Sequence, residues 1–218
     1  LVEGVDKALS RMNLDYVDVC FCHRPDPDTP LEEVVHAMNE MILRGKVFYW
    51  GTSNFSAADL FEMYRIAERD RLVGPTMEQS VQNMNVRRRV DGELVPVFEK
   101  HGIGTTIYSP LCQGVLTGKY SEGIPEGSRA AYSENMRNAV TEERVEKTKQ
   151  LMPIAEGLGV SMAQLALAWT LKNPNVSTAI IGATRPEQVE DNAGAAEAVE
   201  KLTDEVMAEI EAILDNKP

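Results

Sequence analysis

Five short apolar segments alternate with longer segments of helical periodicity, and this alternation constrains the fold more than any other feature of the chain. The segments cover residues 16–22, 46–50, 76–78, 104–108 and 178–181. They have the length of strands but lack the apolar-polar alternation of a strand that is exposed on one face. Strands that are apolar on both faces and separated by helices are typical of a parallel sheet covered by helices. The sequence therefore predicts an α/β protein.

Helix starts are marked by hydroxyl residues followed by an acidic or amide residue three positions later. Thr29, Ser56, Ser161 and Thr184 stand at such positions and are predicted N-caps. Two further helices are predicted, one at the beginning of the chain and one at its end, from apolar residues at helical spacing. Residues 111–140 are rich in glycine and have neither a capping pattern nor apolar residues at helical spacing, so they are predicted to form a long loop.

The charge balance limits the classes of partner. The chain has 22 basic and 34 acidic residues, which gives a formal net charge of −12. A nucleic-acid ligand or an anionic lipid surface requires a basic footprint, so neither is expected as the main partner. No segment has the 18 or so consecutive apolar residues of a membrane-spanning helix, so direct membrane insertion is not expected.

The cysteines indicate a reducing environment. Cys20, Cys22 and Cys112 are the only three in the chain, and two residues two positions apart on one strand are poorly placed for a disulfide. Their spacing also does not fit a zinc site, and no metal site is expected. Because the chain shows no signal-peptide pattern either, a cytoplasmic location is predicted.

Polar residues follow each predicted strand. These are His23 with Arg24, Ser53 with Asn54, Gln79, Ser109 with Pro110, and Gly182 through Thr184. Parallel strands bring their carboxyl ends to one edge of a sheet, and this edge carries the ligand site in barrels and doubly wound sheets. The alternative is that strand ends become polar only because they meet water. The glycine-rich dinucleotide turn, the phosphate-binding GxxxxGK[ST] loop, HExxH and GxSxG are all absent.

Local features favour an anionic ligand. Thr184 precedes Arg185 at a predicted helix N-terminus, where free N–H groups and the helix dipole can bind a phosphate. Lys119 and Arg129 lie in the predicted loop and could close over a diphosphate, although both could also be ordinary surface charges. His23 is the one histidine that directly follows a predicted strand, so it is a candidate for binding a carbonyl oxygen.

Together these motifs resemble the aldo-keto reductases, and within them the branch that holds the β-subunits of voltage-gated potassium channels. The resemblance is carried by residues 14–26, 49–53, 78–79, 109–120, 181–184 and 188–192 and extends over essentially the whole chain. It implies a (β/α)8 TIM barrel with NADP(H) lying across the carboxyl ends of the strands. The five strands match strands four to eight, so residues 1–218 are expected to form one partial barrel domain.

The resemblance also places the catalytic Asp, Tyr and Lys of the family in a preceding part with strands one to three. We therefore expect the 218 residues alone to be unstable and inactive, because five strands of a barrel leave two open edges.

The resemblance assigns a role to individual residues. His23 matches the fourth member of the catalytic set, and Tyr108 matches the aromatic residue that stacks on the nicotinamide. Asp191 stands where many relatives have Glu, which makes its reach towards the adenine less certain. The residues that match cofactor contacts are Ser53, Asn54, Gln79, Tyr108, Ser109, Pro110, Leu111, Gln113, Lys119, Arg129, Gly182, Thr184, Gln188, Asp191 and Asn192.

Two functions follow from the resemblance. The first is reduction of aldehydes or ketones to alcohols by hydride transfer from NADPH, with a small carbonyl compound as substrate. The second is a cytosolic regulatory β-subunit that binds NADP(H), has slow or vestigial catalysis, and docks as a homotetramer on the α-subunit of a potassium channel. His23 favours the enzyme, because the channel β-subunits of animals often have Asn at this position.

Overall fold

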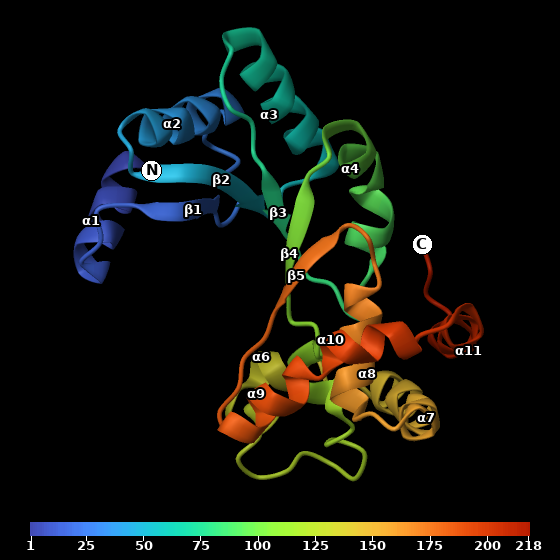
Figure 1. The fold of residues 1–218 in the computed structure, drawn as a ribbon. Helices are drawn as coiled ribbons and strands as arrows, with labels where there is room; N and C mark the ends of the chain where they lie inside the picture. The colour runs from blue at the N-terminus through green and yellow to red at the C-terminus, as the bar shows by residue number, and fades with distance from the viewer. The chain divides into compact units, whose positions relative to one another are not determined.

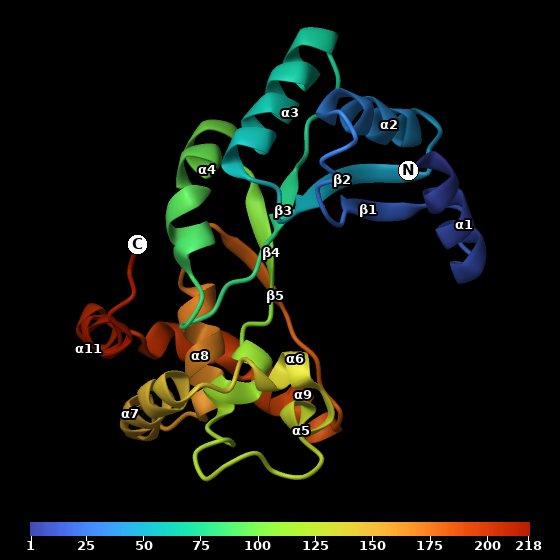
Figure 2. The ribbon, with the colours of Figure 1, turned by 180° about the vertical axis from the view of Figure 1, so that it is seen from behind.

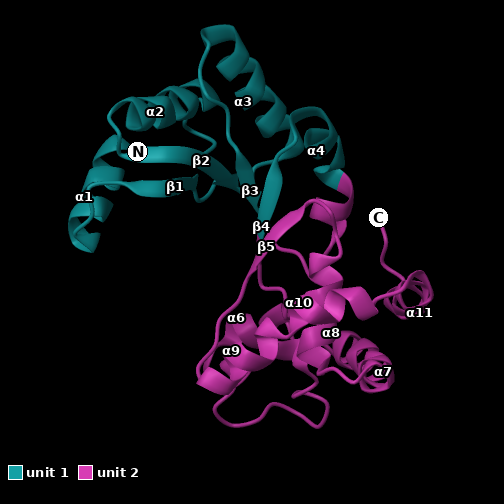
Figure 3. Ribbon diagram, viewed as in Figure 1, with its two compact units in different colours: residues 1–80, 93–106 teal, residues 81–92, 107–218 magenta.

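The computed structural model describes all 218 residues, which divide into two compact units (Figure 3). Unit 1 contains residues 1–80 and 93–106, and unit 2 contains residues 81–92 and 107–218.

Unit 1 holds the first strands and the helices between them. Its elements are α1 (Val2–Met12), β1 (Val17–Cys22), α2 (Leu31–Leu43), β2 (Val47–Ser53), α3 (Ala57–Asp70), β3 (Met77–Gln79) and α4 (Val95–His101). Strand β4 (Gly104–Tyr108) begins in this unit and ends in unit 2. In Figures 1 and 2, α2 and α3 lie along the same side of the strands.

Unit 2 is mostly helical. It contains η2 (Cys112–Thr117), α5 (Arg129–Tyr132), α6 (Glu134–Arg137), α7 (Glu142–Leu158), α8 (Met162–Leu171), β5 (Val176–Ile180), α9 (Pro186–Ala193), α10 (Ala195–Ala198), η3 (Val199–Lys201) and α11 (Asp204–Leu214). A π-helical turn, η1 (Arg89–Glu93), precedes α4.

The strands form the predicted parallel sheet, in the order β1-β2-β3-β4-β5. The pairs β1–β2, β2–β3 and β3–β4 are parallel, with Val17 opposite Val47, Gly51 opposite Met77, and Met77 opposite Gly104. Because the strands run in one direction, each helix returns the chain to the start of the next strand.

The core of unit 1 lies between the sheet and α2 and α3. Met38, Met41, Leu60 and Met63 are fully buried beside Trp50, whose indole N–H donates to the carbonyl of Val73 at 2.9 Å. Each such side chain contributes about 1.5–3 kcal/mol through removal from water. Unit 2 has its own core, in which η2, α7, α8 and α11 meet around Leu116, Leu151, Leu165 and Leu214.

Several predicted boundaries were wrong. Strand β2 continues through Ser53 rather than ending at residue 50, and β5 covers Val176–Ile180 rather than 178–181. The predicted burial on both faces also fails for the start of β2, in which Phe48 and Tyr49 are exposed, and for β5, in which Ser177 and Thr178 are exposed. Strand β5 is the last in the order and lacks a neighbour on one side.

Two of the four predicted N-caps were also wrong. Ser56 and Ser161 form complete capping boxes, with Asp59 and Gln164 respectively. The hydroxyl of Thr29 instead donates to Asp26 at 2.7 Å, and α2 begins after Pro30. Thr184 bonds to the side chain of Gln188, and Arg185 stands at the start of α9. Residues 111–140 are likewise not one loop, because they include η2, α5 and α6.

No single helix has the length and apolar character needed to cross a bilayer. The pair α7 and α8 meets these criteria only when the two helices are taken together, across a bend of 90°.

The stability of unit 1 should depend on pH through His101. Its ring stacks on Tyr64 with the centroids 3.7 Å apart, and burial, with a smaller contribution from Lys100, lowers the pKa of the imidazole. The unfolded chain, with a histidine pKa of about 6.5, then binds protons more readily than the folded chain. We therefore expect the melting temperature to fall as pH decreases from about 6.5 through the lower pKa of the folded state. His101→Phe keeps a stacking ring and should flatten this dependence between pH 7.5 and 5; equal slopes for both proteins would contradict the assignment.

Candidate functional site

The carboxyl ends of the first three strands meet in unit 1. Ser53, the last residue of β2, is buried and donates from its hydroxyl to the carbonyl of Gln79 at the end of β3, at 3.0 Å. The same hydroxyl accepts from Arg24, which follows β1, at 3.1 Å, and from the side-chain amide of Asn54 at 3.0 Å. Parallel pairing thus brings together residues that are up to 55 positions apart, counted from Arg24 to Gln79.

Glu78 organises this cluster, and its role was not recognised in the sequence. Its carboxylate is completely buried and accepts from the hydroxyl of Thr52 at 2.5 Å and from the backbone N–H of Asn54 at 2.6 Å. The hydroxyl of Ser80 donates to it at 3.1 Å. Asn54 has a φ of 61°, in the left-handed region, and the bond from its N–H to Glu78 helps to hold that conformation. A buried carboxylate is stable only with such donors.

His23 lies at the rim of this cluster. Its side chain is exposed, and its backbone carbonyl accepts from Arg24 at 2.7 Å. His23, Arg24 and Phe55 also line a cavity of about 830 Å³ in unit 1, together with residues of α2.

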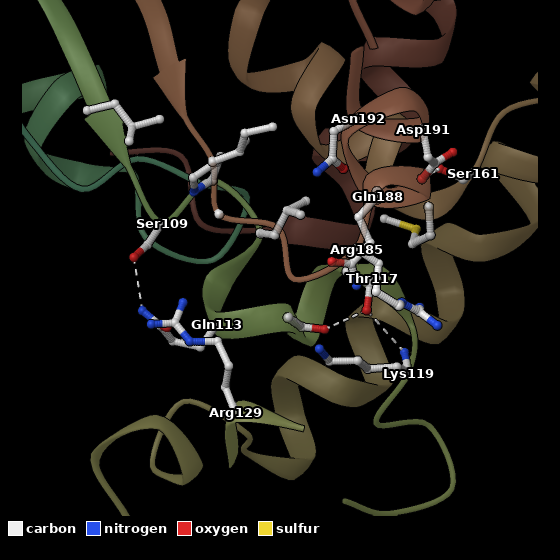
Figure 4. Close-up of a pocket in the computed structure, with 18 residues that line it drawn as sticks. Ser109, Gln113, Thr117, Lys119, Arg129, Ser161, Arg185, Gln188, Asp191 and Asn192 are labelled. Atoms are coloured by element: carbon white, nitrogen blue, oxygen red, sulfur yellow. Dashed lines mark hydrogen bonds between the residues drawn. The ribbon is translucent and has the colours of Figure 1, made fainter. Parts of the chain in front are cut away.

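Unit 2 contains a second cavity, of about 390 Å³ (Figure 4). Its volume lies within the range of about 300–1,000 Å³ that is typical of small-molecule sites. The predicted residues that line it are Ser109, Pro110, Leu111, Gln113, Lys119, Arg129, Gly182, Gln188, Asp191 and Asn192. The ends of β4 and β5 therefore share one cavity with η2 and α9.

The wall formed by residues 109–114 has an unusual backbone. Ser109, Cys112 and Gln113 have φ values of 55°, 48° and 57°, and Gly114 has a φ of 97°. The amide nitrogen of Gln113 donates to the hydroxyl of Ser109 at 2.9 Å, while its buried Oε1 has no partner. For the three residues that carry a side chain, such conformations cost of order 1–3 kcal/mol each, and they are concentrated at functional sites.

Three cations line the cavity from separate segments. Lys119 follows η2, Arg129 begins α5, and Arg185 precedes α9 (Figure 4). The ammonium of Lys119 lies close to Gly114, where a Cβ atom would be only 2.7 Å from Nζ. A cluster of three cations facing one cavity favours a ligand with several negative charges.

Five predicted cofactor residues do not line this cavity, namely Ser53, Asn54 and Gln79 in unit 1 and Tyr108 and Thr184 in unit 2. Thr184 lies instead on a separate shallow pocket with Pro186 and Val189, and Tyr108, at the end of β4, is half-buried. Conversely, Thr117, Ser161 and Met162 line the cavity without having been assigned to it from the sequence, and Arg185, predicted at an anion-binding helix N-terminus, lines it as well. The Ser161 capping pattern was visible, but nothing local indicated that its hydroxyl would reach α9. The assignment of all these residues to one cofactor remains a prediction.

The cysteines are unsuited to nucleophilic chemistry. All three are free, and burial raises the pKa of Cys22 to about 12 and that of Cys112 above its usual value. Both thiols therefore stay protonated at neutral pH, and the thiolate is the reactive species.

One group of side chains in unit 1 has a composition that could hold a metal ion. Glu32, His36 and Asp70 lie near one another and are largely exposed. Arg69 already forms ion pairs with both carboxylates, to Asp70 at 2.6 Å, and lowers the pKa of Asp70. The negative charges of these two carboxylates are thus already paired with a cation of the chain.

Comparison with known proteins decides the family. The model of the aldo/keto reductase family matches residues 1–215. The chain belongs to the aldo/keto reductase family. Members of this family have a TIM-barrel fold, of which a five-stranded parallel sheet with helices forms a consistent part. Members of the family generally bind a nicotinamide cofactor, and membership supports classifying this chain as an oxidoreductase.

The similar curated proteins carry a different kind of name. The chain is 48% identical to a probable voltage-gated potassium channel subunit beta of Arabidopsis thaliana and 47% identical to one of Oryza sativa, in each case over 100% of this chain and 68% of the relative. A putative voltage-gated potassium channel subunit beta of Schizosaccharomyces pombe is 43% identical over 65% of its length. The predicted resemblance to this branch of the aldo/keto reductases is confirmed.

Proposed function

We propose that the chain binds NADP(H) and forms the cofactor-holding part of an oxidoreductase that reduces aldehydes or ketones to alcohols. The observation that carries this proposal is the cavity of unit 2, in which Lys119, Arg129 and Arg185 face one space together with polar residues of α9. A dinucleotide requires such a combination, because its phosphates need cations and its nucleoside needs hydrogen-bond partners.

The residues of the cavity fit this cofactor. Gln113 offers a buried Oε1 that lacks a partner within the chain, as expected of a group that completes its hydrogen bonds with a ligand. Gly114 leaves the space beside Lys119 that a side chain would fill. In this proposal the diphosphate is bound by Ser109, Pro110, Leu111, Gln113, Lys119 and Arg129, and the adenosine end by Gly182, Gln188, Asp191 and Asn192.

Residues of unit 1, together with Tyr108 of unit 2, are proposed to serve the reacting end. When bound, the nicotinamide supplies the hydride. Ser53, Asn54 and Gln79 hold the carboxamide, and the bond from the backbone N–H of Asn54 to Glu78 keeps Asn54 in place for this task. His23 orients the carbonyl oxygen of the substrate by a hydrogen bond, and Tyr108 provides the aromatic face for the nicotinamide.

Arg185 is expected to favour NADPH over NADH. A guanidinium that lines the cavity can bind the extra phosphate of NADPH in a bidentate manner, whereas NADH offers it no such partner. Arg185→Gln should weaken NADPH binding about tenfold and change NADH binding less than about twofold. The matched control is Arg129→Gln, which should weaken both cofactors by similar factors. Equal effects of Arg185→Gln on both cofactors, measured by fluorescence titration, would contradict this assignment.

The second candidate function is a cytoplasmic regulatory subunit of a voltage-gated potassium channel. The names of the relatives, at 43–48% identity, favour it. In this function the chain would form part of a homotetramer that docks on the channel α-subunit, and the cofactor would be retained with slow catalysis. Retention of a channel α-subunit on the immobilised complete polypeptide, at a stoichiometry of one to one, would support this function.

Two measurements test the first proposal. Titration of the complete natural polypeptide with NADPH, followed by the blue shift and enhancement of cofactor fluorescence, should show saturable binding. The complete natural polypeptide, supplied with NADPH and an aromatic aldehyde, should oxidise the cofactor faster than the control without enzyme. Binding without turnover would reject carbonyl reduction and leave the regulatory function, whereas absence of binding would reject the cofactor site itself.

A further inference from the structure

The N-terminus of α8 holds one residue of α9 at two points. The hydroxyl of Ser161 donates to Oδ2 of Asp191 at 3.0 Å, and the side-chain amide of Gln164 donates to the backbone carbonyl of Asp191 at 2.8 Å. Ser161 and Gln164 are the two members of the capping box that begins α8. A local helix-start signal therefore also fixes a residue 30 positions later in the chain.

The contact between the two helices is close. At Gly194, which follows α9, a Cβ atom would lie 2.5 Å from the amide nitrogen of Gln164. The absence of a side chain at this position allows the amide of Gln164 to reach the carbonyl of Asp191. The neighbouring Asn192 is buried and lines the same cavity as Asp191 and Ser161 (Figure 4).

The carboxylate of Asp191 retains a binding capacity. Ser161 occupies Oδ2, while Oδ1 has no hydrogen-bond partner within the chain. An aspartate has one methylene fewer than a glutamate, so the location of its carboxylate depends more strongly on the backbone that carries it. The bond from Gln164 restrains that backbone, and the bond from Ser161 restrains the side chain.

We propose that Ser161, supported by Gln164, is a positioning residue that holds the Asp191 carboxylate at the cavity wall for the adenosine half of the cofactor. This inference rests on the proposed function. Ser161 acts through Asp191, so its contribution to affinity should disappear when Asp191 is removed. A purely structural N-cap would instead lower stability and leave the coupling with Asp191 at zero.

The test is a double-mutant cycle on the full chain, with adenosine 2′,5′-bisphosphate as the titrated probe in calorimetry. Ser161→Ala should weaken binding about tenfold in the natural background and less than about twofold in the Asp191→Ala background. Ser161→Thr, which retains the hydroxyl, should restore most of the affinity. Thr203→Ala is the matched control, because Thr203 caps α11 away from the cavity and its loss should leave affinity unchanged.

A further variant distinguishes an effect on folding from an effect on binding. Glycine is well tolerated at N-caps, so Ser161→Gly removes the hydroxyl at little cost in stability and keeps the cycle interpretable if Ser161→Ala does not fold. An equal loss of affinity in both Asp191 backgrounds, or the same loss in Thr203→Ala, would overturn the positioning role. If the unmodified chain binds neither this probe nor NADPH, the proposed function fails first and the positioning role fails with it.

Discussion

Replacing Glu78 with alanine will lower the free energy of unfolding by about 3 kcal/mol or more, because it leaves several buried donors without an acceptor. The hydroxyl of Thr52, the N–H of Asn54 and the hydroxyl of Ser80 all donate to this carboxylate, which is fully buried.

Glu78→Gln should recover part of this loss, since an amide still offers one acceptor oxygen. Urea unfolding followed by circular dichroism measures both variants. Glu99→Ala serves as the control, because Glu99 is exposed on α4 and its replacement should change the free energy of unfolding by no more than about 0.5 kcal/mol. A loss below about 1 kcal/mol for Glu78→Ala would show that the carboxylate does not organise the cluster.

Replacing Gly114 with alanine will greatly weaken NADPH binding. A Cβ atom at this position would lie 2.6 Å from Cε and 2.7 Å from Nζ of Lys119, so the flexible lysine must move away from the cavity. The φ of 97° adds backbone strain of about 1 kcal/mol or more for any residue with a side chain. Because the displaced atoms belong to the end of a flexible side chain, we expect a modest cost in stability and a loss of affinity of about tenfold or more.

Gly45→Ala separates the effect of backbone strain from the effect of displacing Lys119. Gly45 also has a positive φ, of 66°, but no atoms lie within 4 Å of the Cβ that alanine would introduce. It should show the backbone strain in thermal unfolding and bind NADPH as the unmodified chain does. If both variants retain full affinity in fluorescence titration, Lys119 does not contribute to cofactor binding from its present position.

The sequence predicted the parts of the fold that depend on local chemistry. Apolar segments without alternation predicted parallel strands, and the capping boxes at Ser56 and Ser161 correctly marked the starts of two helices. The same local signal failed at Thr29 and Thr184, because the helices begin one residue later, after Pro30 and Arg185. A capping pattern shows that a helix can begin at a residue, and the local backbone decides whether it does.

The sequence likewise predicted some residues of the candidate site correctly and others not. Ten predicted residues line one cavity of unit 2, because they follow neighbouring strands or lie on one helix. Thr184 lines another pocket, whereas Arg185 lines both that pocket and the cavity.

The class of fold and the polar segments that follow the strands could be predicted from the sequence alone, since both are encoded by spacing along the chain, and the family was indicated by the resemblance of its motifs. Only the tertiary structure decided that Glu78 is a buried acceptor and that Ser161 holds Asp191. Glu78 bonds to Thr52, 26 positions away, and Ser161 to a residue 30 positions away. Such contacts depend on which strands and helices pack together, and the desolvation of a polar group depends on everything that surrounds it.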